Sequence, residues 1–221
     1  MTAPFKLGFT SFDRLRGVLV TFCAEGLKFG PATQKALSAL GDLPGRAAAA
    51  DRFTGKKAST LDIIAPSGLN VPRLVIVGTG KERELKERDL VKLGGAAMGK
   101  IPSAAAQATI FAEFAGGALK GDQVAKLALG ARLRAYAFER YKTKRKEGEE
   151  RAKQLGVNFA CANSAAAEKA WARTAAVADG VVLARDLVNE PANVLYPGEF
   201  AVAPRPCGNW VSSSRFLTSR R

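Results

Sequence analysis

Histidine is absent from the 221-residue sequence, and cysteine occurs only at Cys23, Cys161 and Cys207. Without histidine, every catalytic arrangement in which an imidazole activates a serine or cysteine nucleophile is excluded. The cysteines are odd in number, far apart and without a C-x-x-C pair, which argues against a disulfide framework and against a structural zinc site. We expect Cys23 and Cys161 to be small buried apolar residues.

The sequence also lacks long apolar runs, although 47% of its residues are hydrophobic. Nothing approaches the roughly 18 consecutive apolar residues of a membrane-spanning helix. The first residues, MTAPFKLGFTSFDRLRG, alternate between apolar and polar types and contain no unbroken apolar segment of a secretory signal. The remaining composition is that of a globular protein. We therefore expect a cytoplasmic protein that does not bind a membrane.

Acidic residues are scarce relative to basic ones, and the formal net charge is +14. Residues 142–153, KTKRKEGEERAK, hold six bases against three acids, and residues 202–221 hold four arginines and no acid. Such an excess points to an acidic partner, either nucleic acid or an acidic companion domain. Aromatic residues do not interleave with the bases, and no recognised nucleic-acid-binding motif is present. Nucleic-acid binding is therefore the alternative prediction rather than the first.

Glycine-rich phosphate-binding motifs are missing as well. Gly80-Lys81 has Val75 where a Walker A loop needs its first glycine, and Glu82 where serine or threonine would hold magnesium. Gly78-Thr79-Gly80 begins a G-x-G-x-x-G pattern, but its third glycine position is not a glycine. We interpret this segment as a turn that ends a strand.

The only dense group of carboxylates is Glu147, Glu149 and Glu150. Carboxylates alone can bind a hard divalent cation. This group, however, lies among lysines and arginines in a turn-like segment, where solvated charge pairing explains it better. The sequence therefore predicts no catalytic, metal-binding or substrate-binding residue.

Short apolar runs bounded by turn-forming residues predict six strands. The runs cover residues 6–12, 17–22, 60–65, 73–77, 108–114 and 157–162. The third and fourth read as a hairpin that leads into a fully buried central strand. Helical patterns occupy much of the sequence between the strands. The predicted fold class is therefore α/β, a mixed sheet sandwiched by helices.

The predicted helices run from Pro31 to Gly41, over residues 88–101, from an N-cap at Asp122 to Phe138, and over residues 164–188. Residues 43–58 contain proline and glycine with several bases, and we expect a loop there. The last helix would be on the order of 35 Å long, which suits a connector between two domains. Its apolar stripe consists of Ala167, Trp171, Thr174, Ala178, Val181, Ala184 and Val188.

Three segments, in order along the chain, resemble the leucyl aminopeptidase (cytosol aminopeptidase) family. RLVIVGTGK at residues 73–81 resembles a strand and turn in the middle of the family's amino-terminal domain. LGARLRAYAFERYKTK at residues 129–144 resembles a later helix of that domain and the segment after it. ADGVVLARDLVNEPANVLYPGEFA at residues 178–201 resembles the helix that leads into the catalytic domain. The last segment is the most specific, and the resemblance covers roughly residues 1–201.

The resemblance implies an amino-terminal domain with a macro-domain-like α/β fold and no catalytic residue, in a hexamer of full-length subunits. In the family, a carboxy-terminal domain binds two divalent metals, zinc or manganese, through a lysine, aspartates and a glutamate. That domain releases N-terminal residues from peptides, with leucine among the favoured ones. Its signatures V-G-K-G, F-D-T-G-G and N-T-D-A-E-G-R do not occur here. No family site residue can therefore be carried over, and we expect no cofactor in this chain.

The resulting domain prediction has three parts. Residues 1–163 form the amino-terminal domain, residues 164–201 the connector helix and the lead-in to the catalytic domain, and residues 202–221 an aberrant, disordered basic tail. The tail is expected to come from a shifted reading frame or a truncated gene, since its period and composition depart from the family after Ala201. We expect this truncated chain to be inactive alone, with peptide substrates reaching only the missing catalytic domain. The alternative is a basic nucleic-acid-binding or assembly module.

Overall fold

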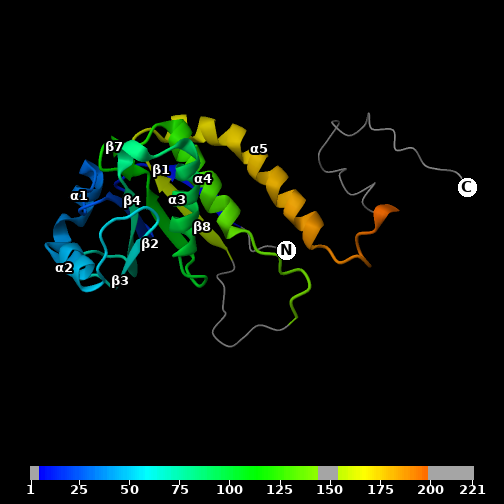
Figure 1. Cartoon of the computed structure of the whole chain (residues 1–221), viewed down its shortest axis with the longest axis horizontal. Coiled ribbons are helices and arrows are strands. Elements are labelled where there is room, and N and C mark those ends of the chain that lie inside the picture. The colour runs from blue at the N-terminus through cyan, green and yellow to red at the C-terminus, as the bar shows by residue number, and fades with distance from the viewer. Residues whose placement is uncertain (1–4, 144–153, 199–221) are drawn as a thin grey trace, which may run out of the picture. The chain divides into compact units, whose positions relative to one another are not determined.

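The computed structural model describes residues 5–143 and 154–198 (Figure 1). The chain divides into two compact units, Met1–Gly180 and Val181–Arg221, and every strand of the described residues lies in the first. No helix in the described parts is long and apolar enough to cross a membrane. Most of residues 142–153, the carboxylates Glu147, Glu149 and Glu150, and the predicted tail at 202–221 lie outside the described residues.

A six-stranded sheet forms the centre of the first unit, with strand order β1-β8-β5-β2-β4-β3. Its strands are β1 (Phe5–Thr10), β2 (Val18–Ala24), β3 (Thr60–Ile64), β4 (Arg73–Gly80), β5 (Gln107–Phe111) and β8 (Leu155–Ala160). All neighbours pair in parallel except β3 and β4, which form the antiparallel hairpin that the sequence predicted. A separate two-stranded ribbon joins β6 (Glu113–Phe114) to β7 (Gly117–Ala118).

Helices cover both faces of this sheet. On one face lie α1 (Pro31–Leu37), the 3₁₀ turn η1 (Ser38–Leu40) and α2 (Leu43–Ala50); on the other lie α3 (Glu87–Gly99), α4 (Gly121–Ala135) and the first turns of α5 (Ser164–Asn189). Strand β2 shows why two layers are needed. Its Val20 and Phe22 pack toward α3 and α4, whereas Leu19 and Cys23 pack toward α1 and α2. The predicted fold class, a mixed sheet between helical layers, is confirmed.

Helices α3 and α4 pack with their backbones in close contact. A β-carbon at Gly94 would overlap with the carbonyl oxygen of Leu127, and one at Gly130 would overlap with that of Val91. Gly95, in contrast, has room, since its β-carbon would lie 3.6 Å from the carbonyl oxygen of Gly130. Glycine at 94 and 130 therefore sets the distance between the two helices.

The predicted loop at residues 43–58 is wrong in its first half, where α2 runs from Leu43 to Ala50. Proline is tolerated in the first helical turn, where its missing N–H has no intrahelical acceptor. Four consecutive alanines then supply high helix propensity. Pro44 and Ala48 are buried, so contact with the core adds to that propensity.

Other boundaries also differ from the predictions, and β4 extends to Gly80, beyond the predicted end at residue 77. The single strand predicted at 108–114 is divided into β5 and β6. The N-cap of α4 is Lys120 rather than Asp122, which lies in the first turn, and α4 ends at Ala135, before Phe138. The Lys120 N–H donates to Gln123 Oε1 at 2.9 Å, so an acceptor three residues into the helix caps its start.

The predicted long helix is confirmed as α5, but its apolar stripe is only partly covered. Ala167 and Ala178 are buried, and Trp171 packs against the core. Further along, Ala184 is exposed and Val188 is 84% exposed. The three-part domain division stays a prediction.

Thr21 in β2 is fully buried, and its Oγ1 has no hydrogen-bond partner within the described residues. Thr21→Val keeps the β-branched shape that a central strand favours and removes the unpaired hydroxyl. We expect the free energy of unfolding to rise by about 1 kcal/mol, measured by urea denaturation. As a control, Thr33→Val removes a buried hydroxyl that is hydrogen-bonded, so it should destabilise the protein. A destabilising Thr21→Val would contradict this account.

Candidate functional site

The last three residues of β4, Gly78-Thr79-Gly80, are the glycine motif that the sequence analysis singled out. The Gly78 N–H donates to Ser59 O at 2.8 Å, and the Gly80 N–H donates to Gly55 O at 2.9 Å. The Thr79 hydroxyl is buried and donates to Cys23 O at 3.1 Å. These three donors therefore all bind backbone oxygens of the chain itself.

This geometry argues against a phosphate cradle at Gly78-Thr79-Gly80, because such a cradle needs backbone N–H groups that point at the ligand. A β-carbon at Gly78 would also overlap with the Lys56 carbonyl oxygen, so the glycine is needed for the close approach between β4 and the loop that contains Lys56. Gly80 has φ +72°, a conformation that glycine adopts without strain. The motif does end the strand as predicted, but it is not a turn, because Gly80 is the last residue of β4.

Glu113 is a buried carboxylate at this edge of the sheet, with 3% of its surface exposed. Its oxygens accept hydrogen bonds from the Ala32 N–H at 3.0 Å, the Thr33 N–H at 2.7 Å and the Thr33 hydroxyl at 2.9 Å. Glu113 thus ties the segment after β5 to the first turn of α1. Its role in the fold is structural.

Two other acids at this edge bind the backbone in the same way. Glu82 accepts from the N–H groups of Ala115 at 2.7 Å and Gly116 at 3.0 Å. Asp89 accepts from the Lys86 N–H at 3.0 Å and lies 3.4 Å from Lys57 Nζ. The backbone hydrogen bond, and then the Lys57 ammonium, lower the pKa of Asp89.

The sequence analysis did not single out these three acids. Asp89 had a local signal, because a carboxylate three residues after a helix N-cap is a known capping pattern. Glu82 and Glu113 had none, since their partners are 33 and about 80 residues away.

No group of three or more metal-binding side chains occurs in the described parts of the chain. Cys23 and Cys161 are buried free thiols, as predicted. Burial, and secondly the Glu82 carboxylate, raise the pKa of Cys23 to about 12, and burial also raises the pKa of Cys161. Both thiols are therefore poor nucleophiles and poor metal ligands at neutral pH.

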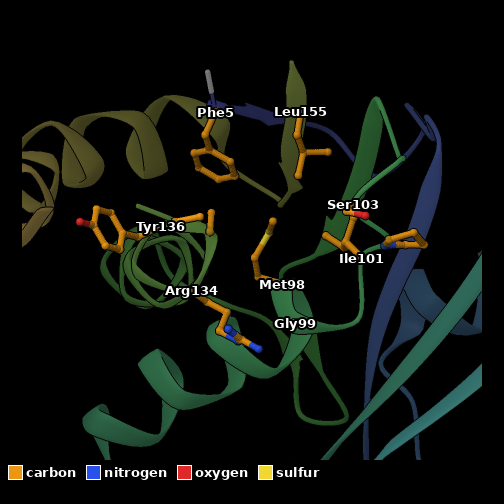
Figure 2. A pocket seen from close by; sticks show the side chains of 11 residues that line it. Phe5, Met98, Gly99, Ile101, Ser103, Arg134, Tyr136 and Leu155 are labelled. Atoms are coloured by element: carbon orange, nitrogen blue, oxygen red, sulfur yellow. The ribbon is translucent and has the colours of Figure 1, made fainter. Parts of the chain in front are cut away.

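A cavity of about 230 Å³ lies at the opposite end of the sheet, where β1 and β8 begin (Figure 2). Phe5 and Leu155 come from the first residues of these strands, and Met98 comes from the last turn of α3. In Figure 2 the Phe5 and Leu155 side chains reach toward Met98 from the other side of the cavity. These three half-buried side chains pack against the core and give the cavity apolar walls.

Arg134, near the end of α4, supplies the charge of this cavity. Its guanidinium group lies against Gly99. A β-carbon placed on Gly99 would be 3.3 Å from the Arg134 Nε. Its neighbour Arg132 differs, because it stacks 5.7 Å from the Phe5 ring and lies 3.7 Å from Asp179. Within the described residues, no carboxylate forms an ion pair with Arg134. The hollow thus has a mixed lining, with apolar side chains from three elements and the exposed Arg134 at its edge.

Comparison with known proteins agrees with the fold and with the sequence resemblance. Residues 18–145 match the family model for the cytosol aminopeptidase family, N-terminal domain. Over 202 residues, the chain is 54% identical to a probable cytosol aminopeptidase of Afipia carboxidovorans and 52% identical to one of Nitrobacter winogradskyi. Each match covers 91% of this chain and 40% of the relative. The chain therefore spans about two fifths of the length of these relatives.

Two solved structures share the fold at lower sequence identity. A mutant of tomato leucine aminopeptidase matches 92% of this chain and 41% of its own, with a TM-score of 0.72 and 22% identity. The bottromycin maturation enzyme BotP, in complex with Mn, matches 86% of this chain and 35% of its own, with a TM-score of 0.61 and 19% identity. The chain belongs to the cytosol aminopeptidase family and contains its N-terminal domain.

Proposed function

We propose that this chain acts as a non-catalytic domain of an aminopeptidase, and that peptide hydrolysis belongs to the part of the relatives that it does not cover. The observation that carries the proposal is the way in which the acids at the carboxyl end of the sheet are used. Glu113 and Glu82 each bind two backbone N–H groups of the fold itself, which leaves them committed to structure. A two-metal peptidase instead needs carboxylates directed at metal ions.

Under this proposal the chain contributes connection and assembly rather than chemistry. Helix α5 connects the sheet unit to the segment that resembles the lead-in of the catalytic domain. Its exposed Val188 would be covered in the longer protein, since exposed apolar side chains on a helix favour contact with a partner surface. The domain would also take part in a homo-oligomer. The divalent metals, manganese or zinc, would be bound outside this chain.

The decisive experiment is a hydrolysis assay of the full 221-residue chain with leucine p-nitroanilide, with Mn²⁺ or Zn²⁺ added. The full-length relative from Afipia carboxidovorans serves as the positive control. We expect no turnover by this chain and no stoichiometric metal after dialysis. Chelator-sensitive turnover that co-elutes with the chain would overturn the proposal.

A further inference from the structure

We propose that the outer edge of strand β3 is an interface at which a second copy of this chain adds its own β3, antiparallel and around a twofold axis at Asp62. Strand β3 is the last strand of the sheet, and within the described parts of the chain only β4 pairs with it (Figure 1). The unpaired edge of such a strand presents N–H and C=O groups that another strand can bind.

The register of the hairpin shows which backbone groups lie on the free edge. The Ala65 N–H, one residue beyond the strand, donates to Pro72 O at 3.0 Å. Backbone groups of alternate residues in an antiparallel strand point the same way, so those of Leu61 and Ile63 also face β4. The groups that face away from the sheet belong to Thr60, Asp62 and Ile64.

This edge lacks the features by which proteins block unwanted strand pairing, which are lysine, proline, a bulge or a covering segment. The strand reads TLDII, and its pairing with β4 has no register shift, unlike the pairing of β2 with β4. Asp62 is exposed, and Ile64 is 69% exposed. The strand at the opposite edge of the sheet, β1, carries the exposed Lys6 instead. We therefore expect a partner strand to cover β3.

The length of the free edge is sharply defined. Ala58 and Ala65 lie on either side of the strand with φ of 62° and 46°, which interrupts the extended conformation at both ends. Non-glycine residues keep this conformation only where the surrounding structure holds them in it. The edge between them has an odd number of outward-facing residues, so it has a central one, Asp62.

This arrangement is self-complementary. A twofold axis at Asp62 places Thr60 opposite Ile64 of the second copy, and Ile64 opposite Thr60 of the second copy. Every outward-facing residue then takes part, and about six hydrogen bonds form, because each directly opposed pair of this type exchanges two. The exposed Ile64 would gain a β-branched neighbour, which is a favourable cross-strand pair.

The charge at the centre favours a second copy over another extended chain. Two carboxylates that face each other across a strand pair repel. In this chain, however, Arg73 Nη1 donates to Asp62 Oδ2 at 2.9 Å. Each copy would therefore bring its own cation to the axis, and the four charges could alternate in sign. An unrelated strand brings no such arginine.

The pairing would join the sheets of two domains into one continuous sheet. In giving a surface to the homo-oligomer of the proposed function, this inference rests on that proposal. The non-catalytic role does not require the pairing, however. Hydrolysis of leucine p-nitroanilide would refute that role and leave the association measurements unchanged, whereas a chain that does not associate would refute the pairing alone.

The first test is sedimentation equilibrium of the full chain from about 1 to 300 μM. A five-residue edge buries less surface than a standard interface, so we expect a reversible dimer with a Kd of about 10–100 μM. Hydrogen exchange followed by NMR at both ends of this range should show protection gained with concentration at the outward-facing Thr60, Asp62 and Ile64. Leu61 and Ile63 face β4 and should be protected at both ends.

Two sets of variants test the register. Ile64→Lys places a charge on the edge at a position that is already exposed, so circular dichroism should be unchanged while the dimer weakens at least about tenfold. The control Val177→Lys, at a position of α5 that is 59% exposed, should associate as the parent chain does. Arg73→Met leaves the two Asp62 carboxylates facing each other without cations and should weaken the dimer about fivefold. Adding Asp62→Asn to Arg73→Met should restore it.

The proposal is overturned if the chain stays monomeric up to 300 μM, if Ile64→Lys dimerises like the parent chain, or if Asp62→Asn does not rescue Arg73→Met. A monomer whose Thr60, Asp62 and Ile64 amides are protected at every concentration would show that the chain covers this edge by itself. That result would overturn the proposal as well.

Discussion

Gly130→Ala is expected to lower the free energy of unfolding by about 3 kcal/mol, at the upper end of the range for overpacked cores. The added β-carbon would overlap with the Val91 carbonyl oxygen. That oxygen belongs to the backbone of α3 and cannot move aside as a side chain could. The two helices would have to separate, and the contacts of Leu93 and Leu127 in the core between them would loosen. Urea denaturation followed by circular dichroism measures the loss.

Gly95→Ala is the matched control, because it adds the same atom to the same helix pair. Its β-carbon would meet the Gly130 carbonyl oxygen at 3.6 Å, an ordinary contact distance. We expect a gain of about 0.5–1 kcal/mol, since alanine is a better helix former than glycine. Equal effects of the two substitutions would show that helix separation does not limit stability here.

Glu113→Ala is the second substitution with a large expected effect, a loss of about 3 kcal/mol in the free energy of unfolding. The change removes the acceptors of two backbone N–H groups and one hydroxyl near the start of α1, and each unpaired buried group costs roughly 1–3 kcal/mol unless water reaches it. Thr33 is fully buried and would be affected most. Hydrogen exchange should therefore show faster exchange at Thr33, in addition to the lower denaturation midpoint.

Two variants separate the lost hydrogen bonds from the lost charge and volume. Glu113→Gln keeps the shape and one acceptor oxygen but turns an amide donor toward an N–H group, so an intermediate loss is expected. Glu84→Ala removes a carboxylate whose side chain is 72% exposed and lies 3.7 Å from Lys81, and it should change stability by less than about 0.5 kcal/mol. If Glu113→Ala lowered the free energy of unfolding as little as Glu84→Ala, the hydrogen bonds of Glu113 would not stabilise the fold.

Local patterns were enough to predict the sheet. The strands β2 and β4 are runs of buried β-branched and aromatic residues, and their two faces pack against two different helical layers. A strand with both faces buried reads as a continuous apolar run. The hairpin of β3 and β4 followed from the proline and glycine residues between them. The family resemblance then supplied the identity of the domain, which no local pattern could supply.

Contacts between distant residues were beyond such patterns. Nothing near Glu113 in the sequence indicates that its carboxylate binds the start of α1, about 80 residues earlier. The cavity was equally hidden, because the ends of four separate elements form it. Helix α2 was missed for a different reason, since proline and glycine were weighed as loop formers although both fall in the first helical turn.

The position of β8 has a consequence for the order in which the domain folds. Among the strands of the sheet this one is made last, yet it lies between β1 and β5 and pairs in parallel with both. Until residue 160 has left the ribosome, β1 has no partner strand and β5 presents an unpaired edge. Unpaired edges attract other chains, and pairing over such sequence distances is slow. We therefore expect synthesis of this domain to include an aggregation-prone interval that ends when β8 inserts, and chaperone binding to nascent chains should peak just before that point.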